Sequence, residues 1–118
     1  MGAKDHDPRN DPEAVRMRAI RRAEGYADNA SRWAHYLGWT DTALSNYEVG
    51  FRRVPRDAAL RLRERVPGLD PIWLWTGEEM GLPVGLRDRL REAERIEREL
   101  SGKPDKAKVL RLSSRDKR

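Results

Sequence analysis

The 118-residue chain has no cysteine. This absence excludes disulfides, thiolate zinc sites and cysteine nucleophiles, and it fits a reducing cytoplasm. Long apolar runs are missing too, since none approaches the ~18–20 residues that a membrane-spanning helix needs. The first ten residues, MGAKDHDPRN, are polar and unlike a secretory signal. We therefore expect a cytoplasmic protein that does not enter a membrane.

Residue groupings that support catalysis or metal binding are also missing. His6 and His35 stand alone without ligand partners, so we expect no metal site. No glycine-rich phosphate loop, paired-carboxylate cleft or Ser/His/Asp set can be assembled. Glu48 has arginines near it and is interpreted as one half of an ion pair rather than as a catalytic acid. The sequence indicates a protein that is not an enzyme, with no cofactor and no evident small-molecule ligand.

Charge, in contrast, is abundant and unevenly distributed. Charged residues make up 38% of the chain and hydrophobic residues 37%, which predicts one compact core under a charged surface. The formal net charge of +5 falls in residues 101–118, which hold seven basic residues and two acids. Residues 1–100 hold 18 residues of each sign. The basic end is either a solvated, flexible tail or a non-specific arm for phosphates.

Apolar spacing and capping residues predict an all-α protein. Residues 1–10 show no apolar periodicity and are expected to be disordered. The pair Asp11-Pro12 is typical of a helix start, and Gly25 is typical of the end of that helix. Helices are predicted over residues 11–24, 29–37, 40–48, 55–66, 72–76 and 83–100.

The helices predicted over residues 29–37 and 40–48 are joined by a very short turn. Ala34 is small enough to let two helices cross closely, and Gly38 tolerates positive φ in the turn. Apolar side chains on both sides of the turn would anchor the second helix: Leu37, Trp39, Leu44 and Tyr47. The other positions of that helix are short and polar, so they can enter the major groove of DNA without steric conflict. The pattern indicates a helix-turn-helix over residues 29–48.

Three stretches of the sequence match a known family in order and spacing. They are Leu37-Gly38-Trp39 with Ala34 before it, residues 44–55 (LSNYEVGFRRVP), and Trp73-Leu74-Trp75-Thr76-Gly77. Through them residues 16–77, about half of the chain, resemble the Cro and lambda-repressor-like (XRE) helix-turn-helix family. The resemblance implies a five-helix DNA-binding domain over residues 11–80, followed by an amphipathic helix over residues 81–100 and a basic flexible tail over residues 101–118.

By position, the resemblance implies that Asp41, Thr42 and Asn46 read bases. Asn46 can pair with adenine, and Thr42 can contact a thymine methyl group. For Asp41 we favour the competing role of a helix cap, because a carboxylate repels phosphate. Contacts to the DNA backbone are expected from Ser31, Arg32, Thr40, Ser45, Arg52 and Arg53. Ordinary solvated surface is the alternative for the arginines.

The helix predicted over residues 83–100 carries a narrow apolar stripe among arginines and glutamates. Its members recur at helical spacing: Leu86, Leu90, Ala93, Ile96 and Leu100. A stripe of this width packs against one partner helix. The stripe either joins two copies in a homodimer or folds back on the core of its own chain.

Together with the resemblance, these features predict a sequence-specific double-stranded DNA-binding transcriptional regulator, a repressor that binds inverted half-sites as a dimer. The alternative is a protein-interaction module with the same fold, such as an antiactivator or antitoxin, that does not read DNA. The neutral charge of residues 1–100 and the carboxylate of Asp41 favour this alternative. Base stacking is not expected of Trp33, Trp39 and Trp73, because they lie at core positions of the pattern.

Overall fold

The computed structural model describes residues 7–102 of the chain. In this range the chain forms six α-helices and one 3-10 helix, with no strand. In chain order they are η1 (Pro8–Asn10), α2 (Pro12–Ala23), α3 (Ala30–Leu37), α4 (Asp41–Glu48), α5 (Arg56–Arg65), α6 (Pro71–Thr76) and α7 (Val84–Gly102). The predicted all-α class is confirmed, and each predicted helix is present with ends that differ by one or two residues.

The first described residues differ from the prediction of disorder over residues 1–10. Residues 8–10 form η1, whose N-terminus is capped by Asp7, which accepts a hydrogen bond from the Arg9 N–H at 3.0 Å. η1 also lies directly against Gly50, where φ is +79° and an added Cβ would come within 2.1 Å of the Pro8 carbonyl oxygen. Apolar periodicity cannot reveal so short an element, because it reports only on helices with a buried face. Residues 1–6 lie outside the described range.

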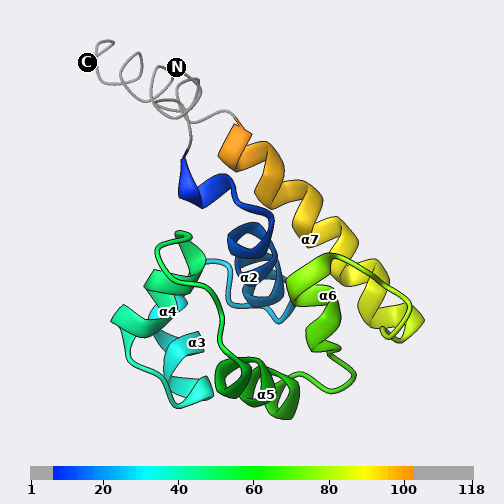
Figure 1. Ribbon diagram of the computed structural model, residues 1–118, viewed down its shortest axis with the longest axis horizontal. Helices are drawn as coiled ribbons and strands as arrows, with labels where there is room; N and C mark the ends of the chain where they lie inside the picture. The colour runs from blue at the N-terminus through cyan, green and yellow to red at the C-terminus, as the bar shows by residue number, and fades with distance from the viewer. Residues whose placement is uncertain (1–6, 103–118) are drawn as a thin grey trace.

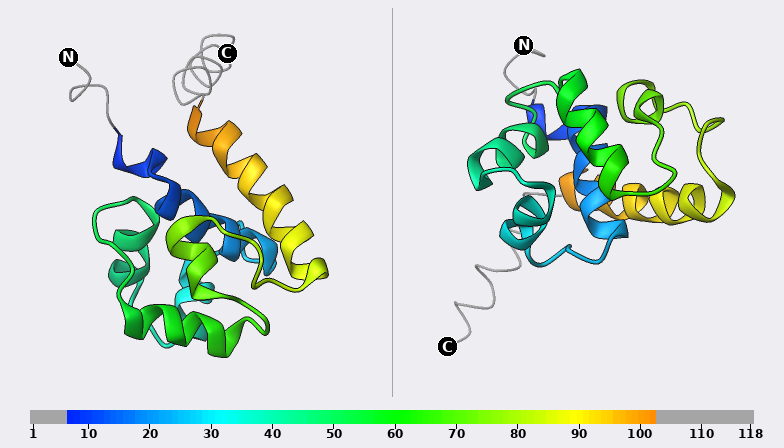
Figure 2. Two further views of the ribbon diagram at one scale, coloured as in Figure 1. Left: turned by 45° about the vertical axis from the view of Figure 1, so that its right-hand side comes forward. Right: turned by 90° about the horizontal axis from the view of Figure 1, so that it is seen from below.

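α2 is the central helix of the fold. Figure 1 shows α3 and α4 on one side of it and α7 on the other, with α5 beside α3 and α6 beside α2 and α5; the turned views of Figure 2 show the same helices. Residues 14–20 of α2 are all buried, so this helix meets other parts of the chain on every side. A helix enclosed in this way must also bury its charged side chains, and Arg16 and Arg18 are among the buried residues.

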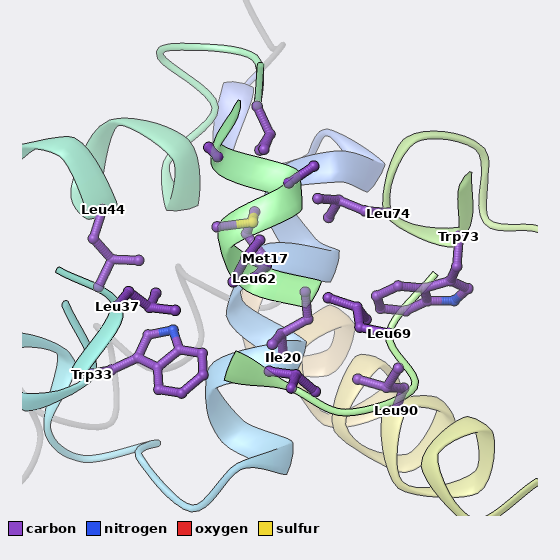
Figure 3. Packing of buried hydrophobic residues seen from close by; sticks show 14 of the residues in the cluster. Met17, Ile20, Trp33, Leu37, Leu44, Leu62, Leu69, Trp73, Leu74 and Leu90 are labelled. Carbon is purple, nitrogen blue, oxygen red and sulfur yellow. The ribbon is translucent and has the colours of Figure 1, made fainter. Parts of the chain in front are cut away.

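The core around α2 is apolar and aromatic, and every α-helix contributes to it (Figure 3). Trp33 and Trp73 are buried in it, which confirms their predicted place. Trp39 is half-buried at the edge of the core and meets Tyr47 edge-on, with ring centroids 5.4 Å apart. Trp75 is also half-buried, and its indole N–H donates a hydrogen bond to the Val54 carbonyl at 3.1 Å.

α7 packs along α2 of the same chain, and this contact decides between the two uses predicted for its apolar stripe. Leu86, Leu90 and Ala93 are only 4%, 0% and 3% exposed, so the prediction that they form a dimer interface is wrong. Ile96 is half-buried, and Leu100 is 58% exposed. The stripe is wide enough for one partner helix, and α2 supplies it without the entropy cost of bringing two chains together. Residues 81–100 therefore share one core with residues 11–80.

The helix α7 continues to Gly102, two residues into the predicted basic tail, and residues 103–118 of that tail lie outside the described range. Among the helices of residues 7–102, none has both the length and the apolar character needed to cross a membrane.

Candidate nucleic-acid interface

The turn between α3 and α4 is fixed by backbone geometry and by a cap. Gly38 has φ = +77°, and its N–H and that of Trp39 donate to the carbonyls of His35 and Ala34 at 3.0 and 2.9 Å. This left-handed closure satisfies the last carbonyls of α3 and turns the chain at once toward α4. Thr40 then caps α4, because its Oγ1 accepts a hydrogen bond from the N–H of the third helical residue at 3.0 Å. The positive φ predicted for Gly38 is confirmed.

Asp41 is the first residue of α4 rather than its cap, so the favoured role of Asp41 as a helix cap is wrong. The Asp41 carboxylate instead accepts a hydrogen bond from the Ser31 hydroxyl at 3.2 Å, and it lies near the positive end of the α4 dipole. Ser31 is in the first turn of α3, which is capped by Asn29 through a 3.0 Å hydrogen bond from the Arg32 N–H. The N-terminal turns of α3 and α4 therefore lie next to each other.

The outward face of α4 consists of short polar side chains. Asp41, Thr42 and Ser45 are exposed and Asn46 is half-buried, whereas Leu44 anchors the helix in the core. α7 does not cover this face, since α2 separates α7 from α4 (Figure 1). The base-reading residues predicted from the sequence thus share one accessible face of one helix.

Two hollows border α4. One, of about 350 Å³, is lined by Tyr47 and by Arg52 and Arg53 of the following loop. The other, of about 320 Å³, is lined by Ser31, Ser45 and other residues of α2 and α4. Side chains of α4 therefore line both hollows, Tyr47 in the first and Ser45 in the second.

Positive charge is in excess around α4. Residues 30–66 contain seven arginines and four acids. Arg32 and Arg52 are exposed, and their guanidinium groups have no ion-pair partner within residues 7–102. Arg53 is exposed as well, and its link to the body is an ion pair with the Glu13 carboxylate at 3.5 Å. The arginines that the sequence predicts as phosphate contacts are therefore available to a ligand.

Behind α4, a buried ion pair ties its C-terminal end to α2. Glu48, the last residue of α4, accepts hydrogen bonds from Nε and Nη2 of Arg21 at 2.8 and 3.1 Å. Nη1 of Arg21 donates to the carbonyls of Tyr26 and Ala27. Burial raises the pKa of the Glu48 carboxyl, and the Arg21 hydrogen bonds act in the opposite direction. The predicted ion-pair role of Glu48 is confirmed, and the pair lies inside the fold.

Arg18 of α2 extends this cluster to α7. It is 4% exposed, and it donates through Nη1 to the Glu48 carbonyl. Its Nη2 donates to the Arg9 carbonyl at 2.9 Å and to the Ser101 hydroxyl at 2.6 Å, and its Nε donates to Glu97 at 3.1 Å. Burial lowers the pKa of the Arg18 guanidinium and Glu97 opposes that shift, but a guanidinium stays protonated in proteins. One side chain thus connects η1, α4 and α7.

This charged cluster was not predicted from the sequence, although the sequence of α2 contains one signal for it. The apolar residues of α2 do not form a single stripe but point all around the helix: Ala14, Val15, Met17, Ala19 and Ile20. Such a helix is enclosed, so its arginines need buried partners. The identity of the partner is not visible in the sequence, because Glu97 lies 79 residues from Arg18.

Comparison of the chain with known protein families, with curated proteins and with solved structures gives no match. The family resemblance of residues 16–77 therefore stays a prediction. Within the part of the chain that the structure describes, no group of three histidine, aspartate or glutamate side chains is placed to hold a metal ion. The candidate site is the polar face of α4 with its unpaired arginines.

Proposed function

We propose that the protein is a sequence-specific double-stranded DNA-binding transcriptional regulator with a lambda-repressor-like fold. The observation that carries this proposal is the outward face of α4, where Asp41, Thr42 and Ser45 are exposed and Asn46 is partly so. Short polar side chains on the exposed face of a helix can reach base edges in the major groove. In this proposal Asn46 pairs with adenine, Thr42 contacts a thymine methyl group, and Asp41 accepts from a cytosine amino group.

Contacts to the phosphates would come from both ends of the α3–α4 pair. Ser31 and Arg32 lie in the first turn of α3, and Arg52 and Arg53 lie in the loop after α4. Thr40 and Ser45 are exposed beside the base-reading positions and add neutral hydroxyl donors. Such contacts fix the register and orientation of the helix on the duplex, while the side chains of α4 discriminate sequence.

We include in this proposal that two copies bind inverted half-sites as a homodimer and act as a repressor. The apolar stripe of α7 is not available for contact between the copies, because Leu86, Leu90 and Ala93 are buried in their own chain. The two copies would meet through another surface or be placed side by side by the DNA itself.

A second candidate function is a protein-interaction module that does not read DNA. One observation favours it: the Asp41 carboxylate is exposed at the start of α4, where a basic partner protein would suit it better than a phosphate. Arg32 and Arg52, on either side of α4, have no ion-pair partner within residues 7–102 and attract an anionic ligand such as a phosphate. We favour DNA because the exposed arginines beside α4, which are Arg32, Arg52 and Arg53, outnumber the single exposed acid of α4 itself, Asp41.

Binding of labelled random and genomic duplexes at several salt concentrations tests the proposed function. We expect retention at low salt, a steep loss of affinity as salt rises, and enrichment of one sequence after repeated selection. The variant Arg32→Gln/Arg52→Gln should bind more weakly with a shallower salt dependence. Arg95→Gln/Arg98→Gln removes two exposed arginines of α7 and should bind like the wild type. If no duplex is retained even at low salt, the DNA-binding proposal fails and the second candidate gains.

A further inference from the structure

Phe51, the only phenylalanine of the chain, lies in the loop between α4 and α5 and is 76% exposed. No other aromatic side chain in residues 7–102 is as exposed. Single exposed apolar residues are common on protein surfaces, so exposure alone assigns no role to this ring. The way in which the loop is held, and the charge beside the ring, indicate one.

The start of the loop is fixed to α4 and to η1. The Arg52 N–H donates to the carbonyl of Asn46 at 3.0 Å, which bends the chain back onto the end of α4 directly around Phe51. Gly50 packs against Pro8 so closely that no Cβ would fit. The backbone on the N-terminal side of Phe51 therefore has a defined position relative to α4.

The end of the loop is fixed by Val54, which is buried. Its N–H donates to the Glu13 carboxylate at 2.6 Å, and its carbonyl accepts the indole N–H of Trp75 at 3.1 Å. Only three residues separate Gly50 from Val54, so Phe51 is held outward on a short loop with two fixed ends. The backbone that carries the ring is therefore fixed before binding, which lowers the entropy cost of inserting the ring into a partner.

The surroundings of Phe51 are positively charged. Arg52 and Arg53 follow it directly, and Arg56 begins α5; all three side chains are exposed. An apolar ring beside several arginines suits a partner whose surface carries rows of anionic groups with apolar surfaces between those rows. Duplex DNA has this construction, with phosphates along the minor groove and stacked bases between them. The hydrogen bond from Arg52 to Asn46 places the ring beside the helix that reads bases.

We infer that Phe51 enters the minor groove next to the bases read by α4 and wedges between two base pairs, while Arg52 and Arg53 hold the adjacent phosphates. This inference rests on the proposed DNA-binding function. A wedge of this kind partly unstacks one base step and kinks the duplex toward the major groove. Pyrimidine–purine steps such as TA and CA unstack most easily, so the sequence preference would extend to a step that α4 does not touch.

The test compares the wild type with F51A and M80A on the duplex that the wild type selects. The fluorescent base 2-aminopurine is placed in turn at each step beside the selected bases. We expect F51A to bind about 5- to 100-fold more weakly, from the size of base–aromatic stacking effects. The wild type should raise the 2-aminopurine fluorescence at one step, and F51A should not. Met80 is 98% exposed in the connection between α6 and α7. M80A is therefore a control that also removes an exposed apolar side chain, and it should bind like the wild type.

The possible results separate this inference from the function on which it rests. Equal affinity of F51A and the wild type, or no fluorescence rise at any step, overturns the wedge and leaves DNA binding in place. Failure of the wild type to bind any duplex overturns both. An unchanged circular dichroism spectrum of F51A, expected for an exposed side chain, shows that weakened binding does not come from a damaged fold.

Discussion

Arginine serves different purposes in α7 and in the segment from α3 to α5. α7 holds five arginines and five acids, and its exposed arginines are paired with acids, either one turn away, as Arg95 is with Glu92 and Glu99, or outside the helix, as Arg91 is with Glu79. The segment from α3 to α5 has a surplus of three positive charges, and Arg32 and Arg52 in it have no ion-pair partner within residues 7–102. Pairing, rather than the number of arginines, decides which surface can attract phosphate.

The comparison also separates structural from binding roles. The inner face of α7 contributes Leu90 to the core and Glu97 to the buried charged cluster, so changes there should affect stability. The outer face of α4 contributes little to the core, so changes at Asn46 or in the loop at Arg52 should affect binding. Each of the following variants tests this division.

The largest effect is expected from Leu90→Ala. Leu90 is fully buried, and truncating a buried leucine leaves a cavity and typically costs about 2–5 kcal/mol of unfolding free energy. Leu100→Ala, on the exposed end of the same stripe, should cost less than about 0.5 kcal/mol. Urea denaturation measures both values. Equal stability of the two variants would show that α7 does not belong to the core.

Glu97→Ala should have the next largest effect. It removes the acid that accepts hydrogen bonds from both Arg18 and Arg22. Breaking a buried pair costs about 3–5 kcal/mol, and we expect about 2–3 kcal/mol because Arg18 keeps its other acceptors. Glu99→Ala breaks an exposed pair with Arg95 on the same helix and should cost about 0.5 kcal/mol or less. Similar unfolding free energies for the two variants would contradict the buried cluster.

Asn46→Ala tests the binding side of the comparison. It should reduce specific DNA affinity by about 1–3 kcal/mol and leave the helical content unchanged. The hydrogen bond from Arg52 is made to the Asn46 backbone carbonyl, so the loop keeps its anchor in this variant. Titration against the selected duplex and circular dichroism measure the two properties. Loss of helical signal together with binding would mean that the Asn46 side chain supports the fold instead.

Arg52→Ala should have a smaller effect that is the same for all sequences. Removing one phosphate contact weakens binding uniformly and lowers the slope of log affinity against log salt by about 1. Arg95→Ala is the matched control, because Arg95 is paired with acids of its own helix. A salt slope that falls equally in both variants would show that pairing does not decide which arginines bind phosphate.

The sequence predicted well those features that depend on neighbouring residues. Asn29 and Gly38 act within one turn of their own position, so the ends of α3 could be placed from residue types alone. The cap of α4 could not, because Thr40 and Asp41 are both capping residue types and the favoured Asp41 is not the cap. The exposed polar face of α4 also follows from spacing, because Leu44 fixes which side turns inward. For the same reason, Thr42 was correctly predicted to be accessible.

Features that depend on distant parts of the chain could not be predicted in this way. The stripe of α7 indicates that a partner helix is needed, but its width is the same whether the partner is α2 or a second copy. The burial of Arg18 likewise depends on Glu97 and Ser101, which approach it only after α7 has packed. Exposed and buried arginines look alike in a sequence, so the partners of Arg18 in the charged cluster behind α4 could be found only in three dimensions.

The smallest effect is expected for an acid that forms an ion pair with an arginine of α7. A hydrogen bond from Arg91 holds the pKa of the exposed Glu79 carboxyl below its usual range. A lowered pKa stabilises the fold above the unfolded pKa of about 4.3, and this contribution is lost as pH falls through the folded value. Arg91→Ala should return the Glu79 pKa toward its ordinary value, measured by NMR titration. An unchanged Glu79 pKa would mean that this arginine is not engaged.

The position of Arg18 has a practical consequence for dissecting the molecule. Its acceptors come from Arg9 near one end of the described range and from Ser101 near the other, so they coexist only in a nearly complete chain. A fragment that stops at Met80 would keep α4 but lose Glu97, and it would expose to water the core surface that Leu86 and Leu90 cover. We expect such a fragment to unfold or aggregate. The smallest autonomous unit for expression or design includes all of α7.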